Sequence, residues 1–142
     1  RMIYKEYGLS LEGSHILFSD YAVRTEYENV EEILRRYPDI TGIVTDSDTQ
    51  ALGILNQLRM LSRRVPEDYS VVCFGGTYQT ELCSPPISGA SSPSYQVGVA
   101  AANKMVDIIS RKVIRPSHLI VDYKMFDGKS IAAPRPRLLP GG

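Results

Sequence analysis

The feature that most restricts the fold is a pair of short apolar runs separated by one helix-like stretch. The runs are "TGIVTD" (41–46) and "YSVVCF" (69–74). The stretch between them, "DTQALGILNQLRML" (48–61), has leucines at helical spacing and Asp48 as its expected N-cap. Two neighbouring strands connected by a helix run parallel, because a parallel pair needs a crossover of about a dozen residues or more. The sequence therefore predicts an α/β fold with a parallel sheet.

The alternation of strand-like and helix-like segments continues on both sides of this unit. "HILFS" (15–19) is expected to be a strand, and the helix after it should begin with Thr25 as N-cap and stop at Pro38. This order favours a parallel-sheet three-layer sandwich. The remaining segments are expected to be an extended crossing segment (84–94), a helix (96–112), a strand (118–126) and a Pro/Gly-rich tail (131–142).

Composition and charge argue against several classes of partner for this segment. The 142 residues are 43% hydrophobic, which is enough for one domain with a core. Lys plus Arg and Asp plus Glu both number 16, and no basic block is present, so nothing predicts nucleic-acid binding here. No apolar stretch approaches the roughly 18 residues that span a membrane, and the opening residues do not predict a signal peptide. Cys73 and Cys83 fit no metal-binding spacing and are interpreted as unrelated thiols, with a disulfide between them as the alternative.

The loop Asp46–Ser47–Asp48 follows the first apolar run, at the edge of a parallel sheet where ligands bind. It lacks the glycines of a phosphate loop or a dinucleotide-binding turn. The two carboxylates could bind Mg²⁺ or act as acid and base, but side chains two residues apart diverge at such a turn and no third ligand follows. His15 and His118 have no Cys or Ser partner in the pattern. We therefore expect one wall of a ligand cleft, without catalytic residues, bound metal or cofactor.

Two motifs in this region resemble the effector-binding domain of the lactose-repressor/galactose-repressor family. In that family a buried strand leads into Asn-Asp-x-x-Ala-x-Gly, and a Val-Pro-x-Asp turn then precedes a Ser-Val-Val-Gly-Phe-Asp strand. The resemblance covers about residues 4–130. The matching residues are Asp48, Ala51 and Gly53 in the first motif, Val65, Pro66, Asp68, Ser70, Val71, Val72 and Phe74 in the second, and Pro85, Pro86 and Gly98 in the crossing segment.

The resemblance implies a lobe of the type I periplasmic-binding-protein-like fold, from a bacterial, cytoplasmic transcription repressor that senses a sugar or a related metabolite. Residues 1–130 would be the C-terminal lobe, and the segment 84–112 would be shared with an N-terminal lobe outside this chain. DNA would be contacted only through a further N-terminal domain. Two alternatives stay open: a solute-binding protein of a transport system, and, less favoured by the motifs, a small α/β enzyme.

Several positions depart from the family pattern at the expected ligand site. Ser47 stands in place of an Asn that faces effector hydroxyls, Gly75 in place of an Asp with the same task, and Asp127 in place of an Arg. Each lost hydrogen bond to a charged group weakens binding by about 1.5–3 kcal/mol, so the usual monosaccharide site is expected to be weakened. Tyr21 either keeps an aromatic stacking position or lies half-covered in its loop. The residues expected to contact the ligand are Tyr21, Asp46, Ser47, Gly75 and Ser94.

The family's dimer interface is built from the helix that matches 48–61 and the segment that matches 79–84. We expect a homodimer here, because apolar side chains on this surface and on the helix 96–112 lack an evident cover. The alternative is that the helix folds back on its own chain and leaves a monomer. The expected contact residues are Leu52, Leu55, Gln79, Leu82 and Cys83, and the apolar helix face comprises Val97, Ala101, Met105, Ile108 and Ile109.

Overall fold

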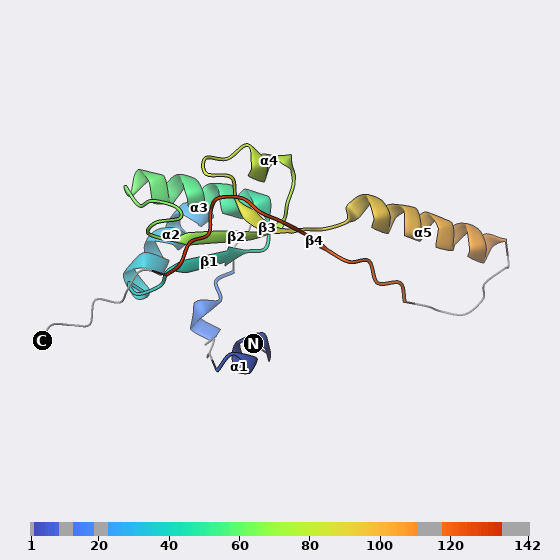
Figure 1. Cartoon of the computed structure of the whole chain (residues 1–142), viewed down its shortest axis with the longest axis horizontal. Coiled ribbons are helices and arrows are strands. Elements are labelled where there is room, and N and C mark those ends of the chain that lie inside the picture. Colours follow the sequence, from blue (N-terminus) through green and yellow to red (C-terminus); the bar gives the residue numbers. More distant parts are fainter. Residues whose placement is uncertain (1, 9–12, 19–22, 111–117, 135–142) are drawn as a thin grey trace, which may run out of the picture.

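A four-stranded sheet forms the centre of the structure, a computed structural model that describes residues 2–8, 13–18, 23–110 and 118–134 (Figure 1). Its elements are α1 (Met2–Glu6), the 3-10 helix η1 (Gly13–His15), α2 (Val23–Arg36), β1 (Gly42–Thr45), α3 (Asp48–Met60), β2 (Ser70–Gly75), α4 (Tyr78–Glu81), β3 (Ser88–Ser91), α5 (Ser94–Ile109) and β4 (Lys124–Phe126). The strand order is β1-β2-β3-β4, with β1, β2 and β3 parallel and β4 antiparallel to β3. The predicted α/β fold with a parallel sheet is confirmed.

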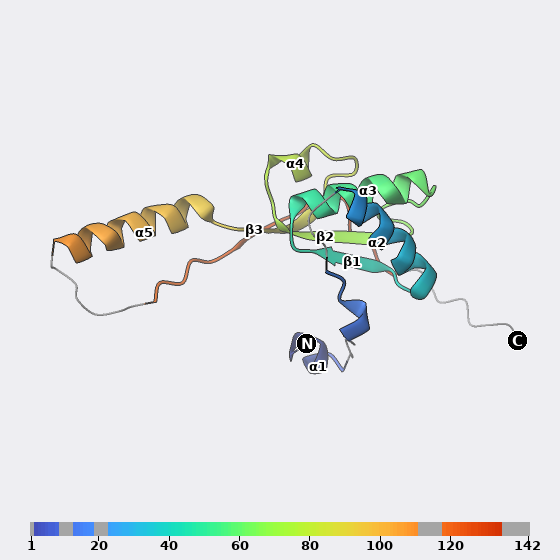
Figure 2. The same ribbon diagram turned by 180° about the vertical axis from the view of Figure 1, so that it is seen from behind.

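The core lies between the sheet and α3, and α2 packs beside α3 (Figure 2). The helix contributes to it because its apolar side chains recur at helical spacing along one face. One cluster joins α2, α3, β1 and β2 through Val30, Ile43, Ile54, Leu58, Tyr69 and Val71. A second cluster joins α3 to β2 and to the residue before β3 through Ala51, Leu55, Cys73 and Ile87. These contacts hold β1 and β2 in register, so that Thr45 lies beside Cys73 where both strands approach their carboxyl ends.

The helix α5 extends away from the sheet, as both views of the chain show (Figures 1 and 2). It follows β3, and the chain returns beside it through residues 118–123 to β4. None of its 16 residues is buried. The helix does not pack on the sheet; among the described residues, segment 118–123 of its own chain runs beside it and leaves most of its apolar side chains exposed. The choice between a homodimer and a monomer in which this helix folds back on its own chain stays a prediction. No helix among the described residues combines the length and apolarity of a membrane span.

The N-terminal predictions need two corrections. The strand expected at 15–19 is wrong for the residues that the structure describes, because η1 ends at His15 and residues 16–18 pair with none of the four strands. Phe18 accordingly leaves 91% of its surface exposed. The helix α2 begins at Val23, two residues before the predicted cap Thr25, and it ends ahead of Pro38 as predicted.

The strand β3 has the sequence "SGAS", which has little strand preference and predicts only an extended segment. Its pairing depends on close approach. A Cβ atom on Gly89 would lie 2.0 Å from the carbonyl oxygen of Cys73 and 3.0 Å from Cζ of Phe126. Glycine therefore allows β3 to fit between β2 and β4. The strand predicted over 118–126 is correct only at its end, since residues 118–123 are irregular.

Backbone and hydroxyl groups bond the chain after β4 to the beginnings of β2 and β3. The buried Ser130 accepts a hydrogen bond from the Ser88 amide to its Oγ (2.8 Å), and its carbonyl accepts one from the Val71 amide (2.9 Å). The Ala132 amide donates to Oγ of Ser70 at 3.0 Å. Bonding to the sheet thus continues two residues into the segment that the sequence predicts as a tail.

Candidate functional site

Three loops leave the carboxyl ends of the parallel strands, and they form the candidate ligand cleft. Asp46 and Ser47 follow β1, Gly75 ends β2, and Ser92 follows β3. The last two loops are bonded directly, because the Ser92 amide donates to the carbonyl oxygen of Gly75 at 3.3 Å. This edge of a parallel sheet is where α/β proteins bind ligands.

Ser47, and not Asp48, is the N-cap of α3. Its backbone is extended (φ −150°, ψ 158°), and its Oγ accepts a hydrogen bond from the Gln50 amide at 3.3 Å. The side chain of Gln50 returns toward the loop and accepts from the Asp46 amide at 3.3 Å. The prediction that Asp48 caps the helix is wrong because its carboxylate turns to another loop. In this cap Ser47 acts as acceptor only, so its hydroxyl proton is not used by the cap.

The carboxylate of Asp48 binds the loop after β2. Oδ1 accepts hydrogen bonds from the Gly76 amide (2.8 Å) and from Sγ of Cys73 (3.3 Å), while Oδ2 accepts from the Thr77 amide (2.9 Å). Burial alone would raise the pKa of Asp48, but the hydrogen bonds from Thr77, Cys73 and Gly76 outweigh it and lower the pKa below the usual value. Burial also raises the pKa of Cys73 to about 11, so this side chain is a thiol that donates to Asp48.

Glycines carry the loop around this carboxylate. Gly75 (φ 139°) and Gly76 (φ 61°) adopt backbone angles that favour glycine. A Cβ atom on Gly75 would lie 2.6 Å from Oδ1 of Asp48, and one on Gly76 would lie 2.4 Å from a ring carbon of Phe126. The position where the family pattern has an Asp therefore has no room for a side chain while Asp48 keeps its place.

The structure places four of the five residues expected to contact a ligand at the strand ends. Asp46 is exposed, Ser47 and Gly75 are partly buried, and Ser94 is exposed at the first turn of α5. Tyr21 lies outside the described residues. No group of three His, Cys, Asp or Glu side chains that could hold a metal ion occurs among residues 2–8, 13–18, 23–110 and 118–134. That the four residues contact a ligand stays a prediction.

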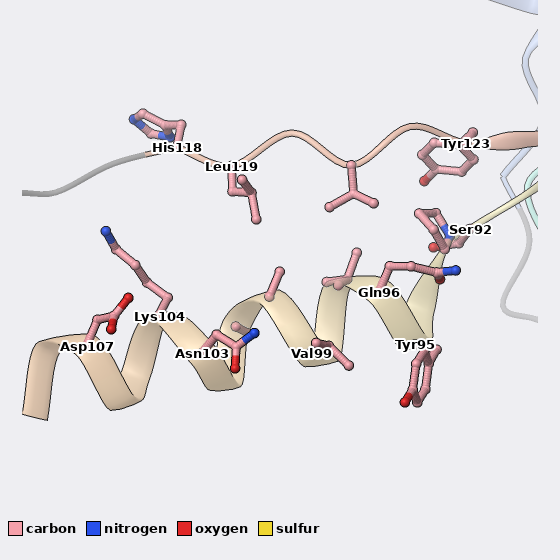
Figure 3. A pocket seen from close by; sticks show the side chains of 15 residues that line it. Ser92, Tyr95, Gln96, Val99, Asn103, Lys104, Asp107, His118, Leu119 and Tyr123 are labelled. Atoms are coloured by element: carbon pink, nitrogen blue, oxygen red, sulfur yellow. The ribbon is translucent and has the colours of Figure 1, made fainter.

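A groove of about 770 Å³ opens between α5 and the returning segment 118–123 (Figure 3). Leu119 points toward the helix, and Tyr123 lies over Ser92 at the end nearest the sheet. Small-molecule sites have similar volumes, about 300–1,000 Å³. The groove does not include Asp46, Ser47 or Gly75, and sequence reasoning placed no ligand contact in its interior. Its other lining residues include Tyr95, Gln96, Val97, Val99, Ala100, Ala101, Asn103, Lys104, Asp107, His118 and Val121.

The surface expected to contact a second copy is only partly available. Gln79 is exposed on α4, Leu82 is exposed directly after α4, and Leu52 is partly buried on α3. Leu55 must be removed from this surface, because it is only 5% exposed and packs in the second core cluster. Tyr78, the first residue of α4, is also exposed on this surface and was not among the predicted contact residues. Cys83 is half-buried against the same core cluster.

Comparison with families and curated proteins gives consistent matches over most of the chain. Residues 3–131 match the model of a family described as a periplasmic binding protein-like domain. The transcriptional regulator RegA of Clostridium saccharobutylicum is 25% identical over 125 residues, which are 88% of this chain and 38% of RegA. The transcriptional regulator CelR of Thermobifida fusca is 28% identical over 115 residues, 81% of this chain and 34% of CelR. The chain thus spans little more than a third of the length of these relatives.

Solved structures give the same picture. A complex of the regulator CelR with cellobiose has a TM-score of 0.84 and 26% identity, covering 92% of this chain and 40% of that one. A LacI family regulator from Arthrobacter sp. FB24 in complex with lactose has a TM-score of 0.80 and 27% identity, covering 92% and 48%. In both cases nearly the whole chain superposes on less than half of the larger protein.

Proposed function

Because the chain belongs to the family of periplasmic-binding-protein-like domains, we propose that it is the C-terminal part of the effector-binding domain of a sugar-responsive transcription regulator. The resemblance to the lactose-repressor/galactose-repressor family is confirmed by regulators of this type among its relatives. The observation that carries the proposal is the match over residues 3–131, which includes all three strand-end loops. Two of the similar structures hold cellobiose and lactose, which supports a carbohydrate effector.

In the proposed mechanism, the strand-end loops form one wall of a cleft and a second lobe forms the other. A ligand changes the relative closure of the lobes only if it binds one arrangement better than the other. Asp46, Ser47 and Ser94 offer a carboxylate and two hydroxyls toward sugar hydroxyls. The chain has no catalytic task in this mechanism. A regulator of this kind acts on DNA in the cytoplasm through a separate domain.

We also assign the crossing segment and α5, within residues 84–112, to both lobes. The support is that α5 has no buried residue, although Val97, Val106 and Ile109 are apolar and exposed. An isolated helix of this length is marginal in water, and its stability normally comes from packing an apolar face. In the proposed regulator the second lobe covers this face and fills the groove beside it.

Sequencing the gene upstream of the Arg1 codon separates the two functions that this fold allows. A helix-turn-helix domain followed by a first lobe supports the regulator. A signal peptide there would instead identify a solute-binding protein of a transport system, and would overturn the proposal.

The 142-residue chain alone should bind cellobiose, lactose and ribose with affinity no better than millimolar. It offers only one wall of the cleft, and Gly75 supplies no carboxylate. Micromolar affinity needs about −8 kcal/mol, which is more than one open wall provides. Isothermal titration calorimetry measures this directly, with the complete regulator as the positive control. Micromolar binding of any of these sugars by the chain alone would contradict the two-wall mechanism.

The chain should form a homodimer that Leu52→Asp dissociates. Leu52 lies on α3, which contacts α4, and the exposed Leu82 directly follows α4. A two-fold interface there would place the introduced carboxylate near its own copy. Light scattering gives the mass, and circular dichroism checks that the variant stays folded. Ser62→Asp adds the same charge at an exposed turn residue beyond the C-terminal end of α3, away from α4, and should leave the dimer intact. A monomeric wild-type chain at high concentration would rule this interface out.

A further inference from the structure

We infer that Asp48 is a positioning residue of the cleft: its carboxylate holds the backbone of Gly75–Thr77 and so shapes the wall that β2 contributes. That this edge of the sheet is a ligand cleft rests on the proposed function, whereas the contact of Asp48 with the loop after β2 is observed directly. Asp48 differs from Asp46 in this respect, because Asp46 is exposed and Asp48 is only 8% exposed.

The geometry gives both carboxylate oxygens of Asp48 a partner on a different element. The amides of Gly76 and Thr77 lie 28 and 29 residues further along the chain and donate at 2.8 and 2.9 Å. The Cys73 thiol donates from the last part of β2. Adjacent amides that point at one carboxylate define the path of the backbone between them. The loop after β1 and the loop after β2 are therefore fixed to each other through this single side chain.

The same carboxylate restricts the residue that can occupy position 75. With Oδ1 only 2.6 Å from an added Cβ atom, any side chain there would have to displace Asp48. The φ angle of 139° adds backbone strain for residues other than glycine. Asp48 thus keeps the end of β2 free of side chains, and an effector would meet the backbone of Gly75 at this point.

Asp48 also fixes the beginning of α4. Thr77 donates its amide to Asp48 and caps α4 with its Oγ1, which accepts from the Gln79 amide at 3.4 Å. The helix carries the exposed Tyr78, and Leu82 follows it. One side chain therefore links the ligand wall to the surface expected to contact a second copy.

Hydrogen exchange of individual amides in the complete chain tests this role with the variant Asp48→Asn. An asparagine has the same shape, but its NH₂ group cannot accept from a second amide. Because the asparagine oxygen can still accept from one amide, at least one of the Gly76 and Thr77 amides should exchange roughly tenfold faster or more, while amides in the middle of α3 keep their rates. Asp46→Asn, which neutralises the neighbouring exposed carboxylate, should change neither amide. Unchanged exchange at both amides in Asp48→Asn would overturn the inference.

A titration of the unmodified chain keeps the test decisive if Asp48→Asn fails to fold. The pKa of Asp48 is lowered from its usual value by the hydrogen bonds that its carboxylate accepts, so these bonds persist down through the ordinary range of a carboxylate and are lost only as the pH falls through the lowered pKa. The nearby thiols of Cys73 and Cys83 have raised pKa values and stay neutral in this range. The carboxylate of Asp46 lies two residues away, so the same titration of Asp46→Asn is the control. The amide resonances of Gly76 and Thr77 should shift together in this pH range, and resonances that stay constant would overturn the inference. Neither readout uses a sugar, so failure to bind sugar would count against the proposed function alone.

Discussion

Gly89→Ala should abolish the cooperative unfolding transition of the chain. The added methyl group would lie 2.0 Å from the carbonyl oxygen of Cys73 and 3.0 Å from its carbonyl carbon, both atoms of the β2 backbone. Ordinary overpacking destabilises by about 1–3 kcal/mol because side chains can move aside. Here β2 and β3 must separate, which removes the ladder between them and frees β4. Urea unfolding followed by circular dichroism measures the loss.

Gly98→Ala is the matched control for this change. Gly98 lies in α5, and nothing occupies the space within 4 Å of its added Cβ atom. Alanine is favoured over glycine inside a helix by about 1 kcal/mol, so this variant should be unchanged or slightly more stable. If Gly89→Ala unfolded at the wild-type urea concentration, the pairing of Gly89 with Cys73 would be wrong.

Leu58→Ala should destabilise the chain by about 2–5 kcal/mol, because it deletes a large side chain from the first core cluster. Leu58 has no exposed surface and packs between α2 and the sheet. The midpoint of urea unfolding should fall strongly. Met60→Ala, two residues later on the same helix, is the control, since Met60 is 75% exposed and surface changes stay within about 0.5 kcal/mol. Equal midpoints for the two variants would remove Leu58 from the core.

The elements that the sequence predicts well are those whose own side chains determine them. The apolar runs of β1 and β2 and the leucines of α3 define a unit that needs no further partner. In contrast, "SGAS" of β3 is a strand because it fits closely between β2 and β4. A fit between two neighbouring strands depends on the tertiary structure and leaves no pattern in the sequence of β3 itself. The run at 16–18 has strand-like residues and no strand to pair with among the described elements.

The strand-end positions of the candidate site residues were predictable, and the hydrogen bonds between them were less so. Asp46 and Ser47 could be placed at a strand end, since parallel strands share one edge. The choice of helix cap between Ser47 and Asp48 could not, because it depends on the Gly76 and Thr77 amides, and every residue except proline has such an amide. Leu55 shows the same limit: its helical spacing fits both a buried and an exposed role, and packing against Cys73 decides for the core.

The segment that contains α5 leaves the sheet at the end of β3 and rejoins it at the beginning of β4, and these two points are adjacent. Ser91, the last residue of β3, is paired with Lys124, the first residue of β4. The segment 92–123 is therefore joined to the sheet by covalent connections at two paired residues. Any movement of α5 relative to the sheet would have to turn about these two residues. Because the Ser92 amide is bonded to the Gly75 carbonyl, such a movement would also act on the end of β2.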